Sequence, residues 1–408
     1  MFEILWRIHN LFVIAVAIIW RRLLFRTTVI AITGSRGKTT ARECLARILG
    51  ADSSITKTLG NNNGRRGIPR TVLRARPRDR YLIVEIGVDR PGVMWRGAFV
   101  VKPDLVVVTG VEPEHMENFP TLEVVAREKA RLVEWLGREG IAVLHGDDPL
   151  VREMATANKG RTTLFGTTVD CDLRIDEPVS NDRDGLSLRV HSGSESGVVK
   201  TQLIGQHWAP AIASAIAAAG ALGVPLEQST ARLNGIEPYP ARMQPVRLKN
   251  GAIIVRDEYN GSAGTLDTAL AVFSHLSARR RIAVLSDFSD DHRPPEERLG
   301  DIGRRVASQF DMAVFVGSNH HHATRGALSC GEPRAIVHGF SELQAGAAFL
   351  RQELREGDVV LLKGRCRDHL SRIYFSLTGP VACWTNGCRL QVLCDICPAL
   401  GPQATCPR

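Results

Sequence analysis

Lys38 and Thr39 end a glycine-rich turn, Gly-Ser-Arg-Gly-Lys-Thr at 34–39, between an apolar run at 29–32 and a segment at 40–49 with helical apolar spacing. Such a turn at a helix N-terminus directs backbone N–H groups and the positive end of the helix dipole at an anion. Lys38 would add a cation for the β- and γ-phosphates, and Thr39 a hydroxyl ligand for Mg²⁺. The turn predicts a nucleotide site, although it is shorter than the usual phosphate-binding loop.

Three further side chains stand at positions where chemistry is plausible. Glu85 ends the apolar run at 81–85, where the carboxyl edge of a strand would deliver a hard oxygen ligand to a metal ion. His115 follows the apolar run at 105–108, and a lone histidine there is ordinarily a packing or surface residue. Lys129 lies in a helix-like segment between Glu128 and Arg131, where the residues alone predict a solvated cation.

The elements that must position these residues alternate in type along the chain. Strand-like runs alternate with amphipathic helical segments such as 122–136, which predicts parallel α/β architecture in two units. We expect a β excursion at 170–203, an alanine-rich helix at 209–223, a linker at 236–245 and a polar loop at 320–322. The strand-like runs are 81–87, 105–110, 141–144, 253–257, 281–287, 312–318 and 358–364.

Composition restricts the class of partner. The 408 residues carry a formal net charge of +9, from 52 basic and 43 acidic side chains, which favours nucleotides, polyanions or an anionic membrane face. Charge is the only feature that suggests a nucleic-acid-dependent ATPase, so we expect no nucleic-acid partner. The apolar run 11–20 is short for a bilayer span and precedes Arg21, Arg22 and Arg26. Residues 1–27 therefore predict a membrane-associated segment, with a soluble packing helix as the alternative.

The motifs together resemble those of the Mur ligase family, so the chain is identified as a member. "ITGSRGKTT" is similar to the family's ATP loop, and "TLGNNNGRRGIPRTVL", "VEIGVDRPGVM" and "EPEHMENFPTLEVVAREKARLVEWL" resemble the branch that adds D-alanyl-D-alanine to the peptidoglycan precursor. "GQHWAPAIASAIAAAGALGV", "PARMQP", "DEYNGSAGTL" and "LLKG" then follow in the family's order. The resemblance covers nearly the whole chain from residue 28.

The resemblance implies a fold and an activity. We expect a P-loop central domain with a parallel sheet at 28–243, a Rossmann-like α/β domain at 244–378 and a cysteine-rich tail at 379–408. The implied reaction is ATP-dependent amide formation between small-molecule carboxylate and amine substrates through an acyl phosphate, in the cytoplasm at the inner face of the membrane. We expect no counterpart of the family's N-terminal UDP-sugar domain, so the acceptor stays open. A poly-γ-glutamate-type polymerising ligase and a catalytically silent ATP-binding scaffold are the alternatives.

The resemblance also assigns roles residue by residue. Nucleotide contacts are implied for Gly34, Ser35, Arg36, Gly37, Lys38, Thr39, Thr40, His207, Arg242 and Asp257. Substrate contacts are implied for Asn61, Asn62, Asn63, Tyr259, Asn260 and Lys363. Catalytic roles are implied for Lys38, Glu85, His115 and Lys129, with Thr39, Glu85 and His115 near magnesium. Lys129 matches a lysine that is often carbamylated, which an arginine could not become.

Two motifs depart from the family, and the tail has its own pattern. Trp208 and Ala211 replace the asparagines expected beside the adenine, and Arg365 and Cys366 follow the "LLKG" motif where the family has Ser-Arg. In the tail, four cysteines with C-x4-C-x5-C-x2-C spacing predict a structural zinc site, with an iron–sulfur cluster, disulfides or free thiols as alternatives. They are Cys383, Cys388, Cys394 and Cys397. The amine substrate and the oligomeric state stay open.

Overall fold

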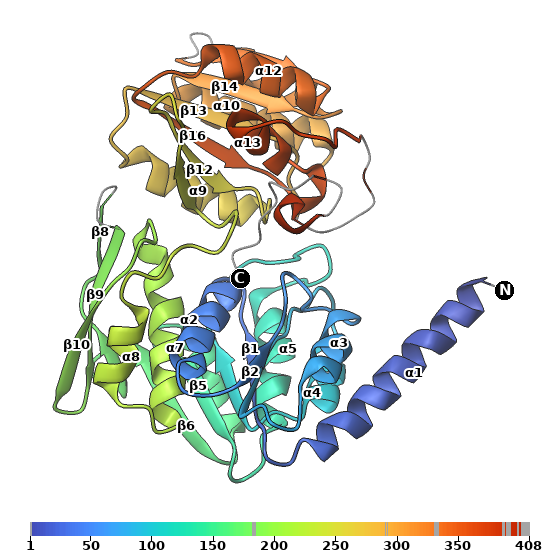
Figure 1. Cartoon of the computed structure of the whole chain (residues 1–408), viewed down its shortest axis with the longest axis vertical. Coiled ribbons are helices and arrows are strands. Elements are labelled where there is room, and N and C mark those ends of the chain that lie inside the picture. The colour runs from blue at the N-terminus through green and yellow to red at the C-terminus, as the bar shows by residue number, and fades with distance from the viewer. Residues whose placement is uncertain are drawn as a thin grey trace. The chain divides into compact units, whose positions relative to one another are not determined.

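A computed structural model of the chain divides into two compact units, Met1–Glu237 and Pro238–Arg408 (Figure 1). The structure describes residues 2–181, 185–289, 291, 293–329, 334–385, 388, 393–397 and 400, with the side chains of 2–7 and 263 left aside. Each unit is a sheet covered by helices, which confirms the predicted α/β fold class.

The first unit is built on one sheet with strand order β10-β9-β7-β6-β5-β4-β1-β3-β2, and β8 pairs with β9. Strands β1 to β7 pair in parallel, whereas β9 runs antiparallel to β7, β8 and β10, as the excursion at 170–203 predicts. The central strands are apolar throughout because helices cover both faces. Their bounds are β1 Thr28–Thr33, β2 Ile55–Lys57, β3 Tyr81–Glu85, β4 Leu105–Val108, β5 Ile141–His145, β6 Arg161–Gly166, β7 Leu173–Ile175, β8 Val179–Asn181, β9 Gly185–Ser192 and β10 Glu195–Lys200.

Two groups of helices sandwich this sheet. α1, α3, α4 and α5 share one hydrophobic cluster with β1, β3 and β4, while α2 packs against α7 (Figure 1). α7 is the predicted alanine-rich helix, and its small side chains allow the glycine turn at 34–37 to approach closely. The helices are α1 Phe2–Leu23, α2 Lys38–Gly50, α3 Gly67–Arg74, α4 Met94–Val101, α5 Leu122–Glu134, α6 Pro149–Glu153, α7 Ala209–Ala221 and α8 Leu226–Leu233, with short 3-10 turns η1 Met154–Ala157 and η2 Gln206–Trp208.

The second unit has strand order β11-β12-β16-β13-β14-β15, parallel except for β11 against β12. Its strands are β11 Gln244–Arg247, β12 Ile253–Asp257, β13 Arg280–Leu285, β14 Met312–Val316, β15 Ile336–Phe340 and β16 Asp358–Lys363. Its helices are α9 Ala263–Ser274, α10 Pro295–Gln309, α11 His320–Leu328, α12 Leu343–Glu353 and α13 Ser371–Thr378, with 3-10 turns η3 Cys366–Asp368 and η4 Cys394–Ile396. The four strands predicted from 253–364 are therefore confirmed.

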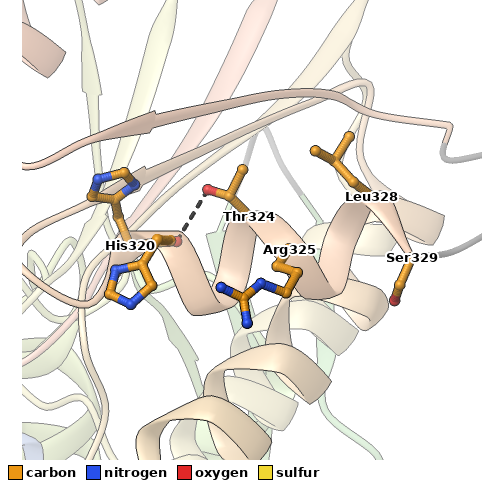
Figure 2. A pocket seen from close by; sticks show the side chains of 6 residues that line it. His320, Thr324, Arg325, Leu328 and Ser329 are labelled. Carbon is orange, nitrogen blue, oxygen red and sulfur yellow. Dashed lines mark hydrogen bonds between the residues drawn. The ribbon is translucent and has the colours of Figure 1, made fainter.

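The histidine triplet at 320–322 corrects one prediction, because it forms the first turn of α11 rather than a loop. Ala323 and Ala327 are buried and set a helical register that begins at His320. The Thr324 hydroxyl donates a 3.0 Å hydrogen bond to the His320 carbonyl, one turn earlier (Figure 2). His320, Thr324, Arg325, Leu328 and Ser329 line an open surface hollow there.

A buried ionic network ties the tail to the second unit. The Arg256 guanidinium donates to both carboxylate oxygens of Asp395 at 2.8 Å and to Glu258 at 2.6 and 2.9 Å. Its Cζ also lies 4.3 Å from the centre of the Tyr374 ring. Arg256 and Glu258 are almost fully buried, so each of these charges depends on its partners.

We expect Asp395→Ala to destabilise the second unit by about 1 to 3 kcal/mol, because Arg256 keeps Glu258 as its counter-charge but loses the acceptors of two buried hydrogen bonds. Chemical denaturation followed by circular dichroism measures the loss. Glu296→Ala is the matched control, since the Glu296–Arg325 pair is about two-thirds exposed on both sides and its loss should cost under about 1 kcal/mol. Equal stability of the two variants would contradict a structural role for the tail.

Candidate functional site

The site in the first unit forms where three adjacent parallel strands end. β1 lies between β3 and β4, with Ile32 opposite Glu85 and Thr33 opposite Val108. The turn 34–37, Glu85 and the segment 109–115 therefore leave the sheet at the same edge. Ligands of open α/β sheets bind at such carboxyl edges, where neighbouring strands connect in opposite directions.

The glycine turn is fixed by contacts that only glycines permit. Gly34 and Gly37 have φ values of 140° and 77°. A Cβ on Gly34 would lie 2.0 Å from Thr109 Oγ1, and one on Gly37 would lie 3.0 Å from the Ala211 Cβ. The turn leads directly into α2, whose first N–H groups have no acceptor within the helix. This arrangement fits a phosphate group.

Ser35 and Arg36 hold the turn against the segment after β4. The Ser35 N–H donates to the Gly110 carbonyl at 2.8 Å, and its hydroxyl exchanges 2.9 Å hydrogen bonds with the backbone of Glu112. The Arg36 Nε lies 2.5 Å from a Glu112 carboxylate oxygen. Thr40 is buried in the first turn of α2, so it packs rather than faces solvent.

Glu114 links the two lysines predicted to be catalytic. Its two carboxylate oxygens lie 3.2 Å from Lys38 Nζ and 3.2 Å from Lys129 Nζ. The lysine side chains are 11% and 0% exposed, so the predicted solvated position of Lys129 is wrong. Lys38 Nζ also donates to the carbonyls of Gly34 and Ser35 at 2.5 and 3.0 Å. Both ammonium groups thus converge on one carboxylate beside the turn.

Burial and charge shift the pKa values of this cluster. Burial alone would raise the pKa of Glu114, but the Lys38 and Lys129 ammonium groups outweigh it and lower the pKa to about 2. Burial lowers the pKa of Lys129 to about 8, although the Glu114 carboxylate partly opposes this effect. Lys129 is therefore an amine with an appreciable neutral fraction near neutral pH.

We expect Glu114→Gln to lose about 3 kcal/mol of stability near pH 7, since a carboxyl pKa about 2 in the fold is well below its ordinary 4.5. The folded pKa is depressed, so this contribution is complete above pH 4.5 and disappears as the pH falls toward 2. Urea unfolding at the two pH values should show that the difference in unfolding free energy between wild type and variant is smaller at pH 3.5 than at pH 7. Glu117→Gln is the control. Equal unfolding free energies of wild type and Glu114→Gln at pH 7 would refute a contribution of the cluster to stability.

Glu85 is buried, and its carboxylate has three side-chain partners. Arg42 Nη1 lies 2.8 Å away, Asn63 Nδ2 donates at 2.8 Å, and Thr39 Oγ1 is 3.2 Å from the nearer oxygen. Arg42 is fully buried in α2 and also donates to the Gly60 carbonyl at 2.9 Å. Sequence reasoning missed Arg42, because a helical arginine ordinarily predicts a surface position. Its only signal is its spacing one turn after Thr39.

The remaining predicted residues of this unit lie in the loop after β2, in the loop after β4 and just before α7. Asn63 also donates to the Asn61 side chain at 2.9 Å, whereas Asn62 is exposed. His115 has a left-handed φ of 51°, and its Nδ1 lies 3.2 Å from Glu117 and its Nε2 4.0 Å from Glu114. His207 precedes α7, and its ring centre is 4.4 Å from that of the buried Trp208.

The second unit brings its predicted residues together at its own carboxyl edge. Asp257 and Lys363 are register partners on β12 and β16, and Lys363 Nζ is 2.5 Å from Asp257 Oδ2 and 3.1 Å from the Asn260 carbonyl. Lys363 is fully buried, so the Asp257 carboxylate supplies the counter-charge that its ammonium group needs. The Arg242 guanidinium lies 4.3 Å from the centre of the Tyr259 ring.

Arg365, one of the departures from the family motif, has a defined position. It pairs with Asp368 at 2.9 Å and with Asp287 at 3.0 Å. Asp287 also accepts from Arg298, so two arginines surround one carboxylate, which keeps the Asp287 pKa low despite the opposing effect of burial. Sequence reasoning missed Asp287, which directly follows the β13 strand and Ser286.

The tail cysteines of the predicted zinc site have separate partners where the structure describes them. Within the described part of the chain, no group of three or more His, Cys, Asp or Glu side chains is arranged to hold a metal ion. Cys383 Sγ lies 3.6 Å from the Thr385 hydroxyl and Cys394 Sγ lies 3.3 Å from His369 Nδ1, so these thiols have separate partners. Burial raises the pKa of Cys394 to about 11, which favours a thiol. Cys383, Cys388, Cys394 and Cys397 form no disulfide, and their binding of a metal stays a prediction.

Comparison with known proteins decides the family. The Mur ligase middle domain matches residues 32–219, and the Mur ligase glutamate ligase domain matches residues 241–366. A UDP-N-acetylmuramoyl-tripeptide–D-alanyl-D-alanine ligase from Mycobacterium tuberculosis is 31% identical over 384 residues, which are 87% of this chain and 74% of the relative. The chain belongs to the Mur ligase family. It is accordingly an ATP-dependent ligase that forms carbon–nitrogen bonds.

Other Mur ligases extend the comparison. The Bacillus subtilis enzyme of the same name is 25% identical over 339 residues, covering 83% of this chain and 73% of the relative. MurF from Acinetobacter baumannii matches the fold with a TM-score of 0.82 at 23% identity, over 90% of this chain and 80% of that structure. MurF from Thermotoga maritima, in complex with ADP, matches with a TM-score of 0.76 at 23% identity, over 90% of this chain and 83% of that structure.

Proposed function

We propose that this Mur ligase joins an amino acid or short peptide to a carboxylate acceptor in the synthesis of peptidoglycan or another envelope polymer. The observation that carries the proposal is the convergence of Lys38, Glu114 and Lys129 beside a glycine turn that fits phosphate. The related enzymes' names make UDP-N-acetylmuramoyl-tripeptide and D-alanyl-D-alanine the first substrates to test.

In the proposed reaction, ATP phosphorylates the acceptor carboxylate, and the amine then displaces phosphate. The protein's task is to position the reactants and neutralise charge. The turn's N–H groups and Lys38 would bind the phosphates, for which Lys38 must exchange part of its contact with Glu114. The Thr39 hydroxyl and the Glu85 carboxylate are hard oxygen donors suited to Mg²⁺, which would neutralise phosphate charge, and His115 would lie near the ion. Of these three, Thr39 and Glu85 are already in contact.

Lys129 is proposed to act as a carbamate. A neutral amine adds to CO₂, one proton leaves, and the product is an N-carboxylate. Burial of the Lys129 side chain disfavours its cation and lowers its pKa to about 8. Part of the Lys129 population is therefore the neutral amine that reacts with CO₂. The new carboxylate would lie near Glu114, so the pair would need Lys38 or a divalent cation between the two negative charges.

The other predicted residues keep their proposed roles. Asn63 is the asparagine best placed for substrate, since it reaches Glu85 directly. Asp257, Asn260 and Lys363 form one connected group in the second unit, suited to orienting a polar ligand, and the Tyr259 ring lies against Arg242. We also propose that His207 and Arg242 contribute to nucleotide binding, and that the enzyme works in the cytoplasm at the membrane's inner face.

The test is a matrix of acceptors and amines with Mg²⁺-ATP, in which the amide product is detected by mass spectrometry. Acceptors include UDP-N-acetylmuramoyl-tripeptide and glutamate oligomers, and amines include D-alanyl-D-alanine and single amino acids. A single adduct supports the proposal, whereas a ladder of products supports the polymerising alternative. ATP binding without any amide from the matrix would favour the silent scaffold.

A further inference from the structure

Helix α1 has an apolar face that the rest of the first unit leaves uncovered. Its exposed side chains recur at spacings of three and four residues, so they lie along one side of the helix. The opposite side packs against the unit's core through Ala17 and Leu24, which are buried, and through Ile14, Ile18 and Trp20. The exposed residues are Ile8 at 57%, Leu11 at 61%, Phe12 at 66%, Val16 at 36%, Ile19 at 61% and Leu23 at 57% exposure.

Hydrogen bonds from the C-terminal half of α1 hold the helix against the rest of the unit. Trp20 Nε1 donates to the Ala75 carbonyl at 2.9 Å, and Arg21 donates at 2.7 Å to the carbonyls of both Val101 and Lys102. Arg21 also lies 3.2 Å from Asp104. In Figure 1 the N-terminal half of α1 extends beyond α3 and α4. The C-terminal half of the apolar face is thus a fixed part of the unit's surface.

Aromatic side chains continue the face beyond α1. Phe25 is 84% exposed, and Phe99 on α4 packs edge-on against Trp135 with ring centres 5.8 Å apart. Arg22 on α1 lies 5.5 Å from the centre of the Phe99 ring, which joins the helix to this aromatic group. Exposed Trp95 completes the group. Tryptophans beside arginines are typical of proteins that rest at the headgroup level of a bilayer.

Charge identifies the occupant. Residues 8–26 contain no aspartate or glutamate, and Arg22 and Arg26 are exposed at the end of the face, with Arg96 exposed beside Trp95. A second copy of the chain would bring two sets of arginines together without counter-charges, whereas anionic headgroups would neutralise them. No described helix is both long and apolar enough to cross a bilayer, which suits a helix that lies along the surface.

We propose that the exposed face of α1, together with Phe25, Trp95, Phe99 and Trp135, lies in the plane of an anionic bilayer. The apolar side chains would enter the boundary between headgroups and acyl chains, and the arginines would contact lipid phosphates. This inference is independent of the ligase proposal, because vesicle binding is measured without any substrate.

The full-length chain should co-float with vesicles of phosphatidylglycerol and phosphatidylcholine, and far less with phosphatidylcholine alone. Phe12→Asp/Ile19→Asp should reduce that binding at least tenfold. The control Val169→Asp/Leu328→Asp changes residues that are 88% and 60% exposed elsewhere and should bind as the wild type does. Arg22→Gln/Arg26→Gln should weaken binding by about fivefold per arginine, with a matching loss of salt sensitivity.

Two results would overturn the inference. One is equal vesicle binding by Phe12→Asp/Ile19→Asp and its control. The other is a wild-type dimer in sedimentation velocity that Phe12→Asp/Ile19→Asp converts to a monomer, with no vesicle binding by either protein. That second result would assign the face to another copy of the chain.

Discussion

Lys38→Ala should lower kcat/KM for ATP-dependent amide formation by about 10²- to 10³-fold or more, the range found when one charge-stabilising donor is removed from an active site. The turn would keep its backbone N–H groups, but the phosphates would lose their nearest side-chain cation. Lys129 would lose a neighbouring positive charge, and of the two lysines it alone would then pair with Glu114. Single-turnover ADP formation at saturating ATP separates a loss in chemistry from weaker binding.

Lys57→Ala is the matched control for that experiment. Lys57 is another lysine of the first unit, is 32% exposed and pairs with Glu43 rather than with the Lys38 cluster. Its loss should leave ADP formation within about twofold, because its partner Glu43 lies in α2 beyond the glycine turn. Similar rates for Lys38→Ala and Lys57→Ala would remove the turn from the proposed mechanism.

Lys129→Arg should lower activity about a hundredfold or more while keeping a positive charge in the cluster. Guanidinium has no neutral amine at working pH, so it cannot form a carbamate. In the wild type, activity should rise with pH up to about 8, since deprotonation of Lys129 precedes reaction with CO₂. Carbon-13 NMR of protein equilibrated with labelled bicarbonate should show one carbamate signal that the variant lacks.

Arginine is bulkier than lysine in a fully buried position, so stability needs a separate control. Lys129→Met keeps the length and apolarity of the side chain without the charge and should be inactive but folded. A wild-type protein that keeps full activity after CO₂ is removed, with no carbamate signal, would show that Lys129 acts as an amine.

Sequence reasoning predicted the elements that have a recognisable short-range pattern. The glycine turn, the apolar runs of β1, β3 and β4, and the α/β order all follow from short-range patterns, and parallel strands then place their ends at one edge. Glu114 and Arg42 could not be found this way. Each matters through a partner 15 or 43 positions away, and such pairing has no periodicity in the sequence.

Neighbours in the sequence do not determine the surroundings of a side chain in the fold. The predicted solvated position of Lys129 came from its charged neighbours in sequence, yet α5 turns it toward the core, where Glu114 supplies the counter-charge. The cysteine spacing in the tail predicts a metal site, and it does not reveal the contacts of Cys383 with Thr385 and of Cys394 with His369. Spacing in the sequence limits which side chains can come into contact, and tertiary packing determines which of these contacts form.

The most direct test of the central claim is transfer of ¹⁸O from a labelled acceptor carboxylate to inorganic phosphate, followed by mass spectrometry. Formation of an acyl phosphate at the edge of β1, β3 and β4 predicts one ¹⁸O in the phosphate for each amide formed. Amide formation with unlabelled phosphate would contradict the account, because the carboxylate would then have been activated by another route.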